Sequence, residues 1–251
     1  MKARLFLIAT LALPALFAAV STRALVGPAN EHGPLEPHVA MLLSRQPGGA
    51  AFCSAVVLRS NVLLTAAHCA STATDARVFF RDGAGAPVLI EVAAFIRHPE
   101  YAPNAIRERK RSIDLALALT STALPARFKP ATLDQGRVIA VGDRFRVAGY
   151  GLSREGIGVS GGVFRWGEIA ARAPLSSVLL WSDDPSQNGL GACSGDSGGP
   201  IFDRNDDIVV AITDWSTGPD KRRHCGGLTQ GALVAPQRAW IDATLDRWRA
   251  R

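Results

Sequence analysis

The sequence has few of the features that mark disordered, metal-binding and parallel-sheet proteins. Only 20% of its 251 residues are charged and no long polar tract occurs, which excludes a disordered chain outside its ends. It has no CxxC pair and no histidine at zinc-finger spacing, which argues against a structural metal. Strands do not alternate with helical segments, which argues against a parallel sheet. We therefore expect a folded chain with no metal and no other cofactor.

An apolar run long enough to span a membrane, roughly 20 residues, is also missing. The longest run, Leu5 to Val20, has sixteen residues, is interrupted by Pro14 and follows a short basic start. A short apolar run of this kind predicts a secretory signal peptide, here residues 1–24. After its removal, no membrane anchor is expected.

Removal of residues 1–24 also takes away three cations and no acids, so the formal net charge falls from +6 by three to +3. The basic composition is therefore no indication of a nucleic-acid partner. Export predicts a secreted or periplasmic protein, and disulfides form in such compartments. An even number of cysteines predicts two disulfides. Three pairings are open for the four residues, which are Cys53, Cys69, Cys193 and Cys225.

Short apolar and β-branched runs, separated by Gly, Pro, Asn and Asp, recur along the chain; "PVLIEVAAFI" and "IVVAITDW" are examples. This pattern is typical of an all-β sandwich or barrel. The end of the chain differs, because "APQRAWIDATLDRW" places apolar residues on one helical stripe. We expect a C-terminal α-helix over about residues 236–249. Its polar face mixes acids and bases, which argues against a membrane-surface helix.

The segment "CSGDSGGPIF" contains Ser197, which is either a turn residue or an activated nucleophile. A serine hydroxyl is a weak nucleophile until an imidazole takes its proton. His68 in "LLTAAHCA" is a candidate base, and Asp114 at the start of "DLALALT" is a candidate carboxylate to orient it. Taken singly, each of the three also has an ordinary structural interpretation.

Taken together, "TAAHC", "DLALAL" and "GDSGGP" occur in the order His, Asp, Ser, and the chain resembles a trypsin/chymotrypsin-family serine protease. The resemblance covers most of residues 25–251. It implies two six-stranded antiparallel β-barrels, about residues 25–135 and 136–235, with the active site in the cleft between them. It also implies a serine endopeptidase that acts on protein or peptide substrates, and we expect a monomer.

The resemblance assigns a role to each candidate residue. Ser197 would attack the scissile carbonyl, His68 would accept and return its proton, and Asp114 would orient the imidazole. The backbone N–H groups of Gly195 and Ser197 would form the oxyanion hole. The implied disulfides are Cys53–Cys69 and Cys193–Cys225.

In this family a latch joins the mature N-terminus to the acid before the nucleophile. Here the resemblance implies an ion pair between Asp196 and the α-amino group of Leu25, the first residue of "LVGP". We expect signal peptidase to expose Leu25 directly. A cut after Arg23, which would leave Ala24 first, is the alternative.

The resemblance also identifies an uncharged specificity pocket, with Gly191 at its floor and Ser216 and Gly231 on its walls. It predicts cleavage after apolar residues such as Leu, Phe or Tyr rather than after Lys or Arg. Asp214 departs from the family, where a serine usually occupies this position. A second carboxylate near Asp114 would raise the pKa of one of the two, so Asp214 is a possible modulator of the triad.

Two other functions compete with this interpretation. "GDSGG" also fits the G-x-S-x-G turn of α/β-hydrolases, but that fold needs the order Ser, Asp, His, and His224 is the only histidine after Ser197. The other alternative is a catalytically weak or inactive protease-like binding module. The presence of all three triad residues argues against it.

Overall fold

The computed structural model describes residues 25–46, 49–70, 76–204, 208–220 and 223–249. The predicted signal peptide and its cleavage site lie outside these residues. Within the described ranges, no helix has the length and apolar character needed to cross a membrane.

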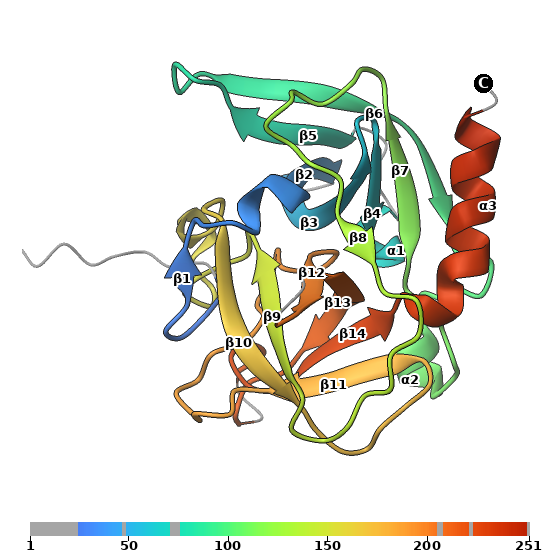
Figure 1. Ribbon diagram of the computed structural model, residues 1–251. Coiled ribbons are helices and arrows are strands. Elements are labelled where there is room, and N and C mark those ends of the chain that lie inside the picture. Colours follow the sequence, from blue (N-terminus) through green and yellow to red (C-terminus); the bar gives the residue numbers. More distant parts are fainter. Residues whose placement is uncertain (1–24, 47–48, 71–75, 205–207, 221–222, 250–251) are drawn as a thin grey trace, which may run out of the picture.

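Six antiparallel strands close the first barrel, in the order β2-β3-β4-β7-β6-β5 (Figure 1). In β5, buried residues alternate with more exposed ones, as expected for a strand with one face towards a core. The strands are β2 (Val39–Gln46), β3 (Gly49–Arg59), β4 (Val62–Thr65), β5 (Ala76–Arg81), β6 (Pro87–Arg97) and β7 (Ala116–Thr120).

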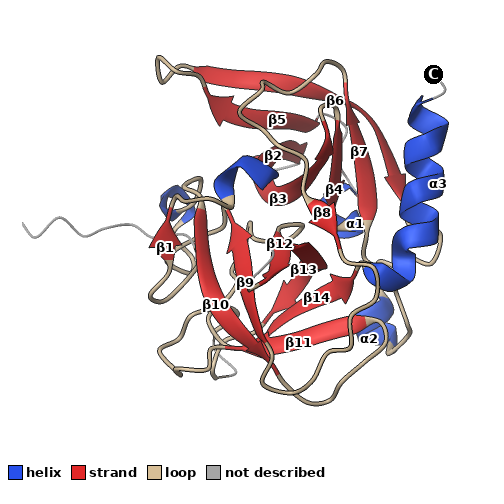
Figure 2. Ribbon diagram, in the orientation of Figure 1, coloured by secondary structure: helices blue, strands red, loops and turns tan. Residues whose placement is uncertain are grey.

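Six further strands form the second barrel, in the order β9-β10-β11-β14-β13-β12, and the ring closes through the pairing of β12 with β9. The predicted all-β fold of two six-stranded antiparallel barrels is therefore confirmed (Figure 2). The strands are β9 (Arg144–Gly149), β10 (Arg165–Ala171), β11 (Leu179–Asp183), β12 (Pro200–Asp203), β13 (Ile208–Ser216) and β14 (Thr229–Leu233). Two short strands join this barrel, β1 (Asn30–Glu31) on β10 and β8 (Thr132–Leu133) on β13.

The N-terminal segment lies on the second barrel, although the division by sequence grouped it with the first. Leu25 is fully buried in the core of the second barrel, and Val26 forms a β-bridge with Gly191. Strand β1 then pairs with β10. Pairing between segments so far apart in the chain leaves no local signal in the sequence.

The predicted C-terminal helix is present as α3 (Arg238–Arg249), after a 3-10 turn η3 (Ala235–Gln237). It returns to the side of the first barrel (Figure 1). Ile241 and Leu245 face the core, and Arg59 of β3 donates a hydrogen bond of 2.7 Å to the carbonyl of Leu245. The remaining helical segments are short: η1 (Glu36–His38), α1 (Ala67–Ala70), α2 (Ala105–Glu108) and η2 (Gly158–Ser160).

A continuous apolar cluster joins the two barrels. Val56 and Leu64 of the first barrel belong to the same cluster as Phe202 and Ile212 of the second. Burial of a large apolar side chain contributes about 1.5–3 kcal/mol. The cluster therefore fixes the barrels against each other, and with them the two walls of the cleft.

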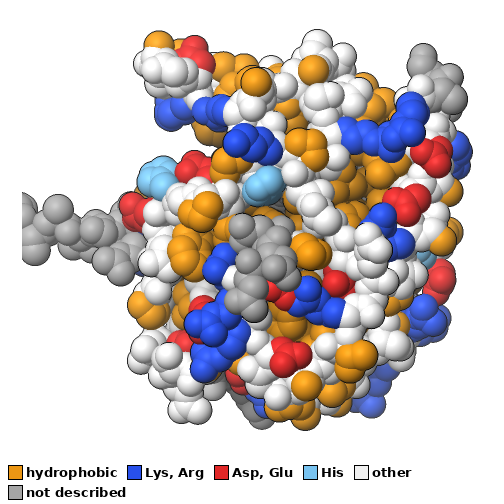
Figure 3. Space-filling model, viewed as in Figure 1, with side chains coloured by type: hydrophobic (Ala, Val, Ile, Leu, Met, Phe, Trp, Pro, Cys, Tyr) orange, Lys and Arg blue, Asp and Glu red, His pale blue; other side chains and the backbone are white. Residues whose placement is uncertain are grey.

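On the face shown in Figure 3, basic and acidic side chains are interspersed. Ion pairs occur at the surface of the second barrel, such as Arg144 with Glu168 and Arg172 with Asp183. Exposed pairs of this kind each contribute little to stability.

Candidate active site

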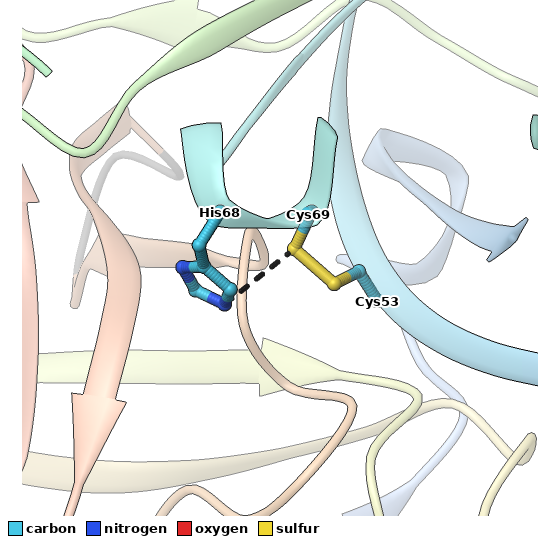
Figure 4. A group of neighbouring side chains, drawn as sticks. All are labelled: Cys53, His68 and Cys69. Carbon is cyan, nitrogen blue, oxygen red and sulfur yellow. Dashed lines mark hydrogen bonds between the residues drawn. A yellow bond between two sulfur atoms is a disulfide. The ribbon is translucent and has the colours of Figure 1, made fainter. Parts of the chain in front are cut away.

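His68 follows a fully buried strand. β4 ends at Thr65, and the single turn α1 then carries His68 next to Cys69. A disulfide joins Cys69 to Cys53 on β3, so the turn is tied to the neighbouring strand (Figure 4). These attachments fix the backbone from which the imidazole projects.

Asp114 precedes β7 and lies between Ile113 and Leu115, which are both fully buried. One carboxylate oxygen accepts a hydrogen bond of 2.9 Å from the backbone N–H of His68, and the other lies 2.7 Å from its Nδ1. An ionised carboxylate only accepts, so Nδ1 is the donor and the proton-accepting lone pair is on Nε2. The predicted partnership of His68 and Asp114 is present.

Opposing effects act on the imidazole of His68. Burial lowers its pKa, but the hydrogen bond and negative charge of Asp114, with a further contribution from the charge of Asp214, outweigh burial. The pKa of His68 is therefore raised above its ordinary value.

The atoms around His68 include a group with the composition of a metal site. Among the described residues, ligand atoms of Cys53, His68 and Cys69 lie within 4.8 Å of one another, and Nε2 of His68 is 3.8 Å from the sulfur of Cys69 (Figure 4). Metals bind the thiolate form of cysteine. Both sulfurs belong to a disulfide, so this group does not have the donors that a cation needs.

Ser197 lies in a loop whose carbonyl groups accept hydrogen bonds from backbone N–H groups. The backbone N–H of Leu152 donates to the carbonyl of Ser194 at 2.8 Å, and that of Gly199 donates to Asp196 at 2.9 Å. A trans peptide directs its N–H opposite to its C=O. These two bonds therefore set the directions of the N–H groups of Gly195 and Ser197, the two predicted oxyanion-hole donors.

Both the backbone conformation and the surroundings of residue 195 require glycine at this position. Its φ of +96° is in the region that favours glycine. A Cβ at this position would lie 2.2 Å from the ring of Phe52. The loop therefore packs directly against β3 of the first barrel.

Asp196 is fully buried beneath the loop. Its carboxylate accepts hydrogen bonds from the N–H groups of Gly151 at 2.8 Å and Cys193 at 2.9 Å. Burial raises its pKa to about 7, although these two bonds and the charge of Arg165 lower it. A carboxylate in this position favours a further cation beside it.

Two glycines make room for this carboxylate. A Cβ at Gly149 would lie 2.4 Å from Oδ1 of Asp196, and one at Gly151 would lie 2.4 Å from its Cγ. On the other side of the loop, the second predicted disulfide joins Cys193 to Cys225. The segment around Asp196 is therefore fixed by steric fit, hydrogen bonds and a covalent bond together.

His68, Asp114 and Ser197 all line one cleft of about 740 Å³. Residues from both barrels contribute to it, as the sequence predicted. Asp214 and Trp215 of β13 line the same cleft. The three predicted triad residues are thus brought to one site.

Asp214 lies at a bulge in β13, where the register with β14 shifts. Its Oδ1 accepts a hydrogen bond of 3.0 Å from the side-chain amide of Gln230. Burial and the negative charge of Asp114 raise the pKa of Asp214 to about 7, even though the side chain keeps partial exposure to the cleft. The second carboxylate therefore interacts electrostatically with the His68–Asp114 pair.

The three residues predicted to form the specificity pocket differ in where they lie relative to the cleft. Ser216 lines the cleft and donates a hydrogen bond of 2.9 Å to the carbonyl of His224. Gly191 and Gly231 are not among its lining residues. A Cβ at Gly191 would lie 3.0 Å from Cα of Gly226, so the backbone of Gly226 lies directly against Gly191.

For Gly231 the reason is the register of β14. A Cβ at Gly231 would lie 2.8 Å from the side chain of Ile201, inside the second barrel. The preceding residue, Gln230, faces the cleft instead. Gln230 was not predicted, but the alternation of a strand that starts at Thr229 puts it on the opposite face from Gly231.

Comparison with known proteins gives a consistent result. Residues 26–241 match the family model for trypsin. The chain is 29% identical to granzyme M of Homo sapiens, over 82% of this chain and 84% of that protein. It is 28% identical to cathepsin G of Mus musculus, over 86% and 83%.

Two solved structures share the fold. One is the structure of a protein named GrC, with a TM-score of 0.71 and 21% identity over 87% of this chain and 98% of that one. The other is neuropsin, a serine protease of mouse brain, with a TM-score of 0.68 and 22% identity over 86% and 98%.

Proposed function

The chain belongs to the trypsin family and is a serine-type endopeptidase, and from this premise we propose that His68, Asp114 and Ser197 are its catalytic triad. The observation that carries the proposal is the pair of bonds from His68 to both oxygens of Asp114, in a cleft that Ser197 also lines. The substrates are proteins or peptides.

In the proposed mechanism, Ser197 Oγ attacks the scissile carbonyl carbon while His68 Nε2 takes its proton. The negative oxygen of the tetrahedral intermediate accepts hydrogen bonds from the N–H groups of Gly195 and Ser197. The imidazolium gives its proton to the leaving amine, and an ester on Ser197 remains. Water, deprotonated by His68, then hydrolyses the ester and releases the serine hydroxyl. Asp114 stabilises the imidazolium that forms in each half-reaction.

A latch at the N-terminus completes the proposal. The burial of Leu25 and the bridge from Val26 to Gly191 support a mature chain whose first residue is Leu25. The protonated α-amino group would then supply the cation that the buried carboxylate of Asp196 favours. Removal of residues 1–24 by signal peptidase would produce this end directly, in a secreted or periplasmic protein that acts as a monomer.

The triad assignment is tested by labelling the mature protein with a fluorophosphonate, which reacts with activated serines. We expect stoichiometric labelling of Ser197, and none in the Ser197→Ala variant. Ser194, in the same loop, is the matched control, because Ser194→Ala should label as fast as the wild type. Folded wild type that does not label would favour a protease-like binding module instead.

We further propose that cleavage follows apolar residues. Ser216, the one residue of the predicted pocket that lines the cleft, is uncharged and offers no carboxylate to a Lys or Arg. A peptide library should give cleavage mainly after Leu, Phe or Tyr, with differences of about 10- to 200-fold for each methylene of fit. Cleavage mainly after Arg or Lys would contradict this specificity.

Asp214 is proposed to modulate the triad through its charge. Its negative form raises the pKa of His68, so the Asp214→Asn variant should move the acid limb of kcat/KM to lower pH. The Asp242→Asn variant, which changes an exposed carboxylate on α3, is the control and should leave that limb in place. An unchanged limb in Asp214→Asn would mean that this carboxylate does not act on the triad.

The same substitution should change how stability depends on pH. The pKa of Asp214 is raised in the folded state to about 7, so the contribution of its protonated form is fully present below about pH 4 and is lost as the pH rises through 7. Between pH 5 and pH 8, Tm should therefore fall less in Asp214→Asn than in the wild type.

A further inference from the structure

We propose that Ser54 is a positioning residue, whose side chain holds the oxyanion-hole loop from the opposite barrel. The proposal rests on the proposed function, because it concerns the loop that carries Gly195 and Ser197. Ser54 lies on β3 of the first barrel and has no exposed surface. It is no member of the proposed triad.

The hydroxyl of Ser54 makes two hydrogen bonds, and both cross from the first barrel to the second. Its Oγ donates to the carbonyl of Gly195 at 2.9 Å and accepts from the backbone N–H of Tyr150 at 2.9 Å. The backbone N–H of Ser54 also donates to the carbonyl of Ser197 at 2.8 Å. One buried residue thus contacts the loop on both sides of Asp196.

These bonds act next to a glycine, whose backbone has wide conformational freedom. Gly195 has φ of +96° and no side chain to restrict rotation. The peptide before it is held by the bond from Leu152 to Ser194, and the peptide after it by the hydroxyl of Ser54. The N–H of Asp196, which belongs to the second of these peptides, also donates to the carbonyl of Cys193 at 3.0 Å. With both planes held, the φ and ψ angles of Gly195 are fixed, and the two halves of the loop keep one arrangement.

Ser54 itself is held in place. The hydroxyl of Thr65 on β4 donates to the carbonyl of Ser54 at 2.9 Å. Phe52, two residues earlier on β3, faces the same loop, as the two-residue period of a strand requires. A rigid strand therefore presents both a packing surface and a hydrogen-bonding group to the loop.

The variant Ser54→Ala removes the hydroxyl and leaves two buried backbone groups, the carbonyl of Gly195 and the N–H of Tyr150, without it. Because the loop that carries the donor N–H groups loses one support but no donor is deleted, we expect kcat to fall by about 10-fold, less than the 100- to 1,000-fold typical of a lost oxyanion-hole donor. KM should stay unchanged. Affinity for a peptide aldehyde, whose adduct places an oxygen in the hole, should fall by the same factor, and affinity for a product peptide should not.

The matched control is Thr120→Val, which removes a buried hydroxyl that bonds the carbonyls of Asn61 and Thr122 in the first barrel. It should lower Tm but leave kcat and aldehyde affinity at wild-type values. If Ser54→Ala also lowers only Tm, Ser54 has a structural role alone and the proposal is wrong.

A second measurement does not depend on turnover. Amide hydrogen exchange of residues 195–198 should be faster in Ser54→Ala than in the wild type and unchanged in Thr120→Val. Unchanged exchange in Ser54→Ala would overturn the positioning role even in an inactive protein. By contrast, a wild type that neither labels nor cleaves peptides would contradict the proposed function and leave the exchange result to decide on Ser54.

Discussion

The buried carboxylate of Asp196 is the constraint on which the nucleophile loop depends. It has no exposed surface, and it is held by two backbone N–H groups and the nearby charge of Arg165. Burial still raises its pKa to about 7, so its environment favours one more positive charge. The glycines at 149 and 151 leave room for it. The residues on either side of it are Gly195, a proposed oxyanion-hole donor, and Ser197, the proposed nucleophile.

The first barrel does more than supply the base. It contributes His68, Asp114 and Ser54, whereas the second contributes Ser197, Asp196 and Asp214. The proposed chemistry therefore exists only where the barrels meet. The shared apolar cluster fixes the position of the two barrels relative to each other. The hydrogen bond from Ser54 in turn joins the nucleophile loop of the second barrel to the first barrel. Packing between the barrels is in this sense a condition of catalysis.

Much of this arrangement was predictable from the sequence. The fold and both disulfides followed from motifs whose residues lie close together in the chain or match a known family, and the three residues proposed as the triad line one cleft. Gln230 and Ser54 were missed, because their importance depends on partners in strands remote in sequence. The position of Gly231 away from the lining of the cleft has a related cause, since one residue of register decides which face of β14 it occupies.

The packing of the N-terminal segment on the second barrel also could not be predicted from the local sequence. The other fully buried members of the cluster around Leu25 lie more than a hundred positions away in the sequence. The family resemblance nevertheless singled it out, through the proposed partnership with Asp196. A positive group at this end would link maturation to the geometry of the loop.

The most direct test compares two forms of the protein, one beginning at Leu25 and one retaining Ala24, by the rate of fluorophosphonate labelling of Ser197. We expect the form beginning at Leu25 to react about 100-fold faster, since a loop without the latch loses aligned oxyanion donors. Equal rates in two folded forms of equal purity would contradict it.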